Sequence, residues 1–111
     1  MIDITRGIEV GGFHFDVDMS DEAHKMLRGE LRCGECSHSE KVMRIDSDMS
    51  DVRISETFLH EVIEAVNNIY CSDSLNHDQI TQLSYGIHQA LESLGVRFGK
   101  DDLDRMGNIG K

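Results

Sequence analysis

The chain has 111 residues, of which 39% are hydrophobic and 5% aromatic, and it contains no tryptophan and no proline. This length predicts one domain with a core of aliphatic residues and methionine. The net charge of −10 argues against a nucleic-acid binder, because phosphate contacts need clustered lysine and arginine. Such acidity is typical of a solvated surface, and it also permits a cation site or a basic partner.

Neither a membrane span nor a secretion signal is visible in the sequence. No stretch approaches the length of about 20 apolar residues that a spanning helix needs. The N-terminal residues Met-Ile-Asp-Ile-Thr-Arg lack the basic-then-apolar pattern of a signal peptide. We therefore expect a soluble, cytoplasmic protein without a membrane partner.

The N-terminal half is predicted to form strands. Apolar and polar residues alternate over residues 8–18 on both sides of Gly11-Gly12, which predicts a hairpin. A short helical turn is expected over residues 20–27. Two further strands are expected over 30–33 and 41–46, with a turn or longer loop between them.

Two helices are expected in the C-terminal half. The first should begin between Ser50 and Ser55 and run to Tyr70 or Cys71, with one apolar stripe. The second should follow Asn76, a favourable N-cap residue, and end at Gly95. Its apolar stripe is predicted to comprise Ile80, Leu83, Ile87, Ala90, Leu91 and Leu94.

Strands followed by helices are typical of α+β domains. We expect a small N-terminal antiparallel sheet followed by two packed helices, in a single domain over residues 1–98. Residues 99–111 contain three glycines and show little periodicity, so they are predicted to be a C-terminal tail, either partly disordered or ordered by a partner.

A candidate cation site lies in the first of these helices. His60 and Glu64 are one helical turn apart, which places them on one face, about 40° apart. A histidine and a carboxylate so placed can bind one small cation, and Glu61 lies beside them. The run has the spacing of the metallopeptidase motif His-Glu-x-x-His, with glutamate in place of the last histidine.

His77, in the first turn of the second helix, is the predicted third ligand. Two antiparallel helices joined by a short loop bring the start of the second close to the end of the first, near Glu64. His88 is the competing histidine, but it lies about 16 Å farther along the same helix and is expected at its solvated edge. Asp78 and Glu92 are weaker carboxylate alternatives.

Two histidines and one glutamate form a known catalytic zinc set that leaves a position open for water. In this interpretation His60, Glu64 and His77 bind the metal, and Glu61 is the general base that takes a proton from the activated water. A mixed nitrogen and oxygen set also suits other divalent ions. Without a metal, the same motif would be a solvated face of an acidic helix.

The three cysteines suggest reduced thiols, because their number is odd and no secretion signal accompanies them. Cys33 and Cys36 form a lone CxxC motif. With His38 nearby, this pair could be half of a zinc site, or it could be a redox pair. No second CxxC exists, so two cysteines that are merely close in a strand or turn are the favoured interpretation.

Residues 55–67 (Ser-Glu-Thr-Phe-Leu-His-Glu-Val-Ile-Glu-Ala-Val-Asn) resemble the active helix of small phage and prophage metallopeptidase-like proteins of the zincin type. The usual run in that family is Glu-Thr-Leu-Leu-His-Glu-x-x-His-Ala. Residues 8–13, 29–30 and 43–45 resemble its strands, and residues 83–91 resemble its second helix. One branch has glutamate in place of the last histidine and a histidine at the start of the next helix, where His77 stands.

The resemblance implies a zincin-like fold, a zinc site and a bacterial host cytoplasm. The first hypothesis is therefore a phage-derived zinc peptidase, whose strand nearest the active helix binds the backbone of a peptide or protein substrate by edge pairing. The alternative is a non-enzymatic acidic binding or inhibitor protein of phage origin that acts on a host protein, with a structural metal or none.

Overall fold

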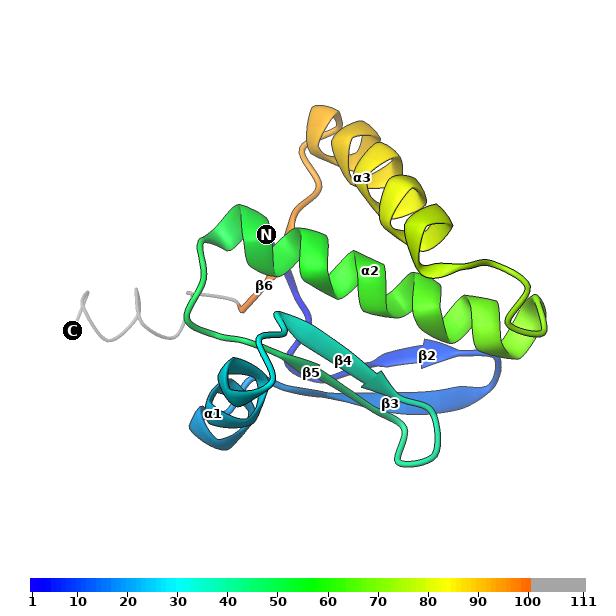
Figure 1. Cartoon of the computed structure of the whole chain (residues 1–111). Coiled ribbons are helices and arrows are strands. Elements are labelled where there is room, and N and C mark those ends of the chain that lie inside the picture. The colour runs from blue at the N-terminus through cyan, green and yellow to red at the C-terminus, as the bar shows by residue number, and fades with distance from the viewer. Residues whose placement is uncertain (101–111) are drawn as a thin grey trace.

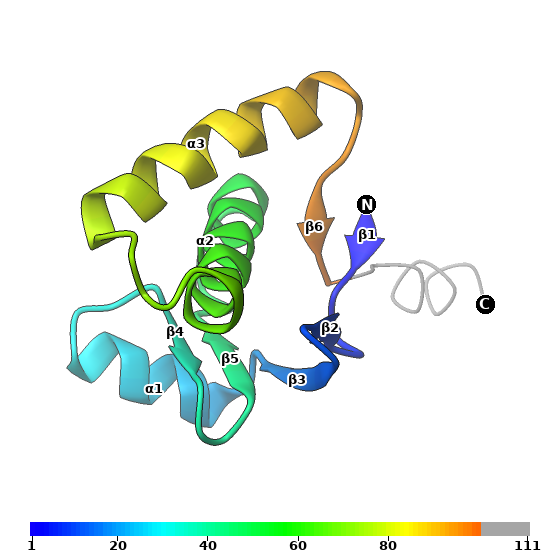
Figure 2. The same ribbon diagram turned by 90° about the vertical axis from the view of Figure 1, so that its right-hand side faces the viewer.

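The computed structural model describes residues 1–100 and shows an α+β fold, as the sequence predicts. Both Figure 1 and Figure 2 show α2 lying between the sheet and α3. The elements in chain order are β1 (Ile2–Asp3), β2 (Ile8–Val10), β3 (Phe13–Asp18), α1 (Asp21–Gly29), β4 (Gly34–Ser37), β5 (Val42–Ile45), α2 (Asp51–Tyr70), α3 (His77–Ser93) and β6 (Phe98–Gly99).

The main sheet has the strand order β2-β3-β5-β4. The predicted hairpin is confirmed, because β2 and β3 pair antiparallel around Gly11 and Gly12. Both glycines have positive φ, 61° and 81°, which suits a tight hairpin turn. The sheet is mixed and not wholly antiparallel, since β3 and β5 are parallel. The reason is that α1 joins the end of β3 to the start of β4 at the same end of the sheet. β4 then carries the chain back, so β5 runs in the direction of β3.

The strand predicted over residues 30–33 is wrong, and β4 lies in the segment predicted as a turn. Residues 30–33 follow the end of α1 at Gly29 and form the link to β4. The Arg32 N–H bonds to the Leu27 carbonyl at 2.8 Å, and Leu31 has a φ of 57°. Glycine usually occupies such a left-handed position at the end of a helix. Here leucine occupies it, so no glycine signal marks this position in the sequence.

The hydrophobic core lies between α2 and the sheet. Ser50 caps α2 by accepting a hydrogen bond from the Arg53 N–H, which satisfies one of the free donors at the start of a helix. The buried hydrophobic cluster comprises Ile4, Val10, Phe15, Met43, Ile45, Ile54, Phe58 and Ala65.

The predicted apolar stripe of α3 is wrong for its most exposed members. Leu94 is 76% exposed and Leu83 and Ile87 are each 43% exposed, whereas Ser84 and His88 are buried. The predicted solvated position of His88 is also wrong, because its side chain is buried. Its Nε2 lies 2.7 Å from Ser55 Oγ, so the buried face of α3 combines this polar contact between two helices with the aliphatic side chain of Ile80.

Two very short strands complete the structure. β1 and β6 pair in parallel and bring the N-terminal segment beside the end of the described chain. Gly99 thus belongs to a strand, and the rest of the predicted tail, beyond Lys100, lies outside the described residues. No helix within residues 1–100 is long and apolar enough to cross a membrane.

A buried carboxylate fastens α1 to the end of β5. Asp46 is 2% exposed, and its carboxylate lies 2.5 Å from His24 Nδ1 and 2.8 Å from Arg28 Nε. Burial opposes its ionisation, but hydrogen bonds from Asp48, His24 and Arg28 outweigh burial and lower the pKa of Asp46 to about 2. These contacts hold α1 against the end of β5, and so they fix the position at which the segment between α1 and β4 begins.

We predict that Asp46→Asn lowers the free energy of unfolding by about 2 kcal/mol at neutral pH, because charged hydrogen bonds are lost. The pKa of Asp46 is lower in the folded than in the unfolded protein, so its stabilisation is present above the unfolded pKa. It disappears as the pH falls from about 4 to about 2. Urea unfolding of both proteins across this range measures the difference.

Asp48→Asn is the matched control. Asp48 is exposed and lies 3.4 Å from the same arginine, Arg28, so this variant should change the free energy of unfolding by less than about 0.5 kcal/mol. Equal stability of the Asp46→Asn variant and the wild type at pH 7 would contradict the role given to Asp46.

Candidate metal centre

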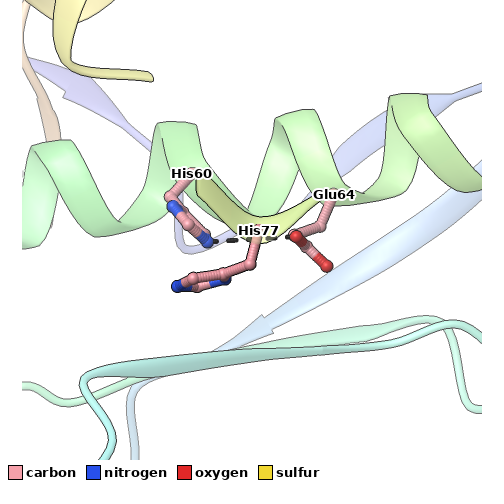
Figure 3. Close-up of side chains that lie close together, drawn as sticks. All are labelled: His60, Glu64 and His77. Carbon is pink, nitrogen blue, oxygen red and sulfur yellow. Dashed lines mark ion pairs between the residues drawn. The ribbon is translucent and has the colours of Figure 1, made fainter. Parts of the chain in front are cut away.

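The side chains of His60, Glu64 and His77 converge. Each offers one ligand atom, and these atoms all lie within 4.8 Å of one another. Among residues 1–100 this is the one group of three or more metal-ligating side chains so arranged. Figure 3 shows the three side chains gathered on one side of α2, with His77 reaching in from the start of α3.

The spacing of these groups is close to that of a zinc site. His60 Nε2 lies 4.0 Å from Glu64 Oε1, and the ring centroids of His60 and His77 are 5.3 Å apart. Nitrogen and oxygen ligands about 2.0 to 2.1 Å from a tetrahedral zinc ion lie about 3.3 Å from one another. Side-chain rotations that close a gap of at most about 1.5 Å would therefore suffice, and the residues fit the metal.

His60 is suited to be a neutral ligand. Burial lowers its pKa, with a smaller lowering effect from His77 and an opposing effect from Glu64. A metal binds the neutral imidazole, so a lower pKa reduces competition from protons. Side-chain exposures of 20% for His60 and 30% for Glu64 leave the pair reachable from solvent.

Glu61 lies beside the three ligands and points toward the sheet. It is 6% exposed. Burial, together with the negative charge of Glu64, raises the pKa of Glu61 to about 8. Buried carboxyl groups of raised pKa next to another carboxylate are a recognised feature of acid–base sites. The position and environment suit transfer of a proton.

Asn67 places His77, and the sequence interpretation missed this residue. The Asn67 amide donates to the Leu75 carbonyl at 3.1 Å and accepts from the Leu75 N–H at 3.0 Å. Asn76 and Gln79 then form a reciprocal capping box at the first turn of α3. The start of α3 is thus held against the end of α2. No local sequence pattern marks this role of Asn67, because it depends on the contact with Leu75.

Two adjoining cavities meet at the site. One of about 260 Å³ extends from His60 and His77 past Cys33 and Tyr85. The other, of about 320 Å³, contains all three candidate ligands and Glu61 and is bordered by Arg32. Both cavities share Gly34, the first residue of β4. The candidate site thus lies where the two cavities adjoin.

Gly34 allows β4 to approach α2 closely. A Cβ atom at this position would lie 2.6 Å from Thr57 Cγ2 and 2.9 Å from Glu61 Oε2. Because β4 is an edge strand, its outer backbone groups have no partner strand among residues 1–100. The Asp46 N–H bonds to the Cys33 carbonyl, so the antiparallel alternation directs the backbone groups of Gly34 and Cys36 away from β5.

The other candidate ligands do not join the group. His88, Asp78 and Glu92 are absent from the cluster, and Glu92 instead bonds Arg97 at 2.9 Å. The geometry does not support the CxxC motif as a redox pair. Cys33 precedes β4 and Cys36 lies within it, so an extended backbone separates them by about 10 Å. A disulfide requires less than about 7 Å between the Cα atoms.

Cys36 is a poor metal ligand in this setting. Its Sγ lies 3.8 Å from His38 Nδ1. Burial and the negative charges of Glu61 and Glu64 raise the pKa of the thiol to about 12. The thiolate, which is the form that binds metal, is therefore disfavoured.

No protein-family model, curated protein or solved structure matches this chain. The assignment of a function therefore depends on the site itself.

We predict that Asn67→Ala weakens zinc binding by at least about tenfold, because His77 is no longer held near Glu64. Loss of two buried hydrogen bonds should also lower the free energy of unfolding by about 2 kcal/mol. Isothermal titration with zinc and urea unfolding measure the two effects. Asn68→Ala is the control, since Asn68 bonds only the exposed Asp73 side chain. Equal zinc affinities of the two variants would contradict the prediction.

We predict that Gly34→Ala lowers stability by about 1 to 3 kcal/mol, because the added methyl group overlaps Thr57 and Glu61. Gly86→Ala is the matched control. No atom lies within 4 Å of a Cβ built at Gly86, and alanine is favoured over glycine within a helix by about 1 kcal/mol. Thermal unfolding should move in opposite directions for the two variants, and a shift in the same direction would contradict the close contact at Gly34.

Proposed function

We propose that this protein is a zincin-like zinc metalloprotein, of the phage type that its helix motif resembles, and that it hydrolyses peptides. The observation that supports the proposal is the convergence of His60, Glu64 and His77 within 4.8 Å, with the carboxyl group of Glu61 buried beside them. Zinc bound there would acidify a water molecule and polarise the carbonyl of the peptide.

The residues of the chain then have separate roles. His60, Glu64 and His77 hold the metal and leave one position open. Glu61 accepts a proton from water and can deliver it to the leaving amine, as a general base and acid does. Its raised pKa is a property of the metal-free site, and a nearby cation would favour the ionised form that accepts a proton.

The edge of β4 supplies a place for the peptide backbone. Its outward N–H and C=O groups lie at Gly34 and Cys36, which border the cavities beside the ligands. An extended peptide that pairs with this edge would pass across the metal site. The main-chain hydrogen bonds would then position the peptide independently of its sequence.

The alternative function, a non-enzymatic binding protein, is favoured by a different observation. Leu83 and Ile87 are each 43% exposed on α3 and border an apolar groove of about 470 Å³. Exposed apolar surface of this kind is typical of protein contacts. In that case the metal would be structural, and no hydrolysis would be measured.

We predict that the wild type binds one zinc ion per chain and that His77→Ala loses it, because two protein ligands on one helix hold zinc weakly. His14→Ala is the control. His14 is exposed and pairs with Glu9, so its loss should leave the metal content unchanged. Elemental analysis after dialysis measures the ratio. Full zinc retention by His77→Ala would contradict the proposed centre.

We predict that Glu61→Gln retains zinc but loses at least about 100-fold in the cleavage rate of a quenched fluorescent peptide library, since general-base catalysis contributes that much. Asp78→Asn, which removes an exposed carboxylate beside His77, should leave both zinc and rate unchanged. Absence of cleavage by the zinc-loaded wild type would support the binding protein instead of the peptidase.

A further inference from the structure

Arg53 differs from the other arginines of the structured chain that carry ion pairs. Arg28, Arg32, Arg44 and Arg97 each form an ion pair with a carboxylate. Among residues 1–100, no carboxylate oxygen lies within 4.0 Å of the Arg53 guanidinium, which is the distance that defines an ion pair. Arg6 likewise has no ion pair among the described residues, but Arg53, although exposed, borders the cleft beside the candidate metal centre.

The Arg53 side chain borders the cavity of about 260 Å³ that also contains His60 and His77. Its Nη2 lies 3.6 Å from Cys33 Sγ. Hydrogen bonds to Cys33 and to Tyr85 raise the pKa of Arg53. A thiol sulfur is a weak acceptor, so most of the five donors of the guanidinium remain available to a ligand.

The distance from Arg53 to the metal centre matches a short peptide. Arg53 and His60 are seven residues apart in one helix, which corresponds to about 10 Å at 1.5 Å per residue. An extended peptide covers this distance with about three residues at 3.4 Å each. A peptide group bound by Arg53 would thus be about three residues from the peptide bond that lies at the metal centre.

The direction of pairing on β4 determines which end of a peptide reaches Arg53. Cys33 and Gly34 border the same cavity as Arg53, whereas Cys36 borders the other. A peptide antiparallel to β4, the commoner and more stable arrangement, runs from Cys36 toward Cys33. Its C-terminal portion would therefore lie over the Arg53 cavity.

We propose that Arg53, with the Tyr85 hydroxyl beside it, binds a carboxylate of a peptide ligand about three residues to the C-terminal side of the metal centre. This inference rests on the proposed function and names its substrate class. The carboxylate belongs either to the C-terminus of a short peptide or to an aspartate or glutamate side chain. Both present the two oxygens that a guanidinium binds with two parallel hydrogen bonds.

Glu56 limits where the carboxylate can lie. It is half-buried, one turn along α2 from Arg53, and borders the same cavity. Its negative charge opposes a second carboxylate placed deeper toward His60. The carboxylate of the ligand is therefore confined to the Arg53 end of the cavity.

The test uses dipeptides that carry a succinyl hydroxamate at the N-terminal end, hydroxamate-succinyl-Leu-Ala, on the zinc-loaded full chain. The succinyl unit and the two residues together cover about three residue lengths. One probe has a free C-terminal carboxylate and a second has a C-terminal amide. A third has glutamate as its last residue and a C-terminal amide. Acetohydroxamate, which binds a metal but has no peptide portion, reports on the metal centre alone.

We expect the free-acid probe or the glutamate probe to bind the wild type about tenfold more tightly than the plain amide probe, as charged hydrogen bonds allow. Whichever of the two binds more tightly identifies the source of the carboxylate. In Arg53→Gln the preference should fall below about twofold, with acetohydroxamate affinity unchanged. Arg32→Gln is the matched control and should retain the full preference, because Arg32 borders the other cavity and is already paired with Glu35.

Equal affinity of the three peptide probes for the wild type would overturn the inference, as would a preference that survives Arg53→Gln. Failure of acetohydroxamate to bind the zinc-loaded wild type would show that the metal centre itself is wrong, and the inference would fall with it. Binding of acetohydroxamate without any carboxylate preference would leave the proposed function standing and reject only the role of Arg53.

Discussion

The side-chain amide of Asn67 bonds both the N–H and the C=O of Leu75, and this pairing ties the end of α2 to the start of α3. His60 and Glu64 are one turn apart on a single helix and need no further support to face one another. His77 belongs to another helix, and it reaches them only because the connecting turn is held in one conformation. The third corner of the candidate metal centre therefore depends on a residue that touches no ligand.

Electrostatics gives the centre a reason to attract a cation. Glu61 is buried beside Glu64, and burial together with repulsion from the Glu64 charge raises the pKa of Glu61 to about 8 when no metal is present. A divalent ion among these groups would compensate that repulsion. The same ion would be held by two imidazoles and the Glu64 carboxylate, and the second carboxyl group, Glu61, would remain free to exchange protons with water.

The sequence predicted the features that depend on local spacing. The i, i+4 relation of His60 and Glu64 follows from helix geometry alone, and Asn76 marked the start of α3. Features that depend on distant contacts were missed. The burial of His88 arises from Ser55, 33 positions earlier, and β4 is a strand because β5 pairs with it. Asn67 and Gly34 have no local pattern that separates them from ordinary helix and turn residues.

The fold also explains why the chain can expose aliphatic residues on α3. The inner face of that helix is occupied by Ile80, Ser84 and His88, so Leu83 and Ile87 face outward. Hydrophobic periodicity predicts the buried face of a helix from its apolar residues alone. It therefore cannot recognise a histidine that is buried because it contacts a hydroxyl group. The inner face of α3 differs from the predicted stripe for this reason.

X-ray absorption spectroscopy at the zinc edge of the loaded protein tests the central claim most directly. Cys36 borders the same cavity as the three ligands, so sulfur coordination is the alternative that the structure itself offers. The account predicts only nitrogen and oxygen neighbours at about 2.0 to 2.1 Å, with the outer-shell scattering of two imidazole rings. A sulfur neighbour at about 2.3 Å, or scattering from a single imidazole, would contradict it.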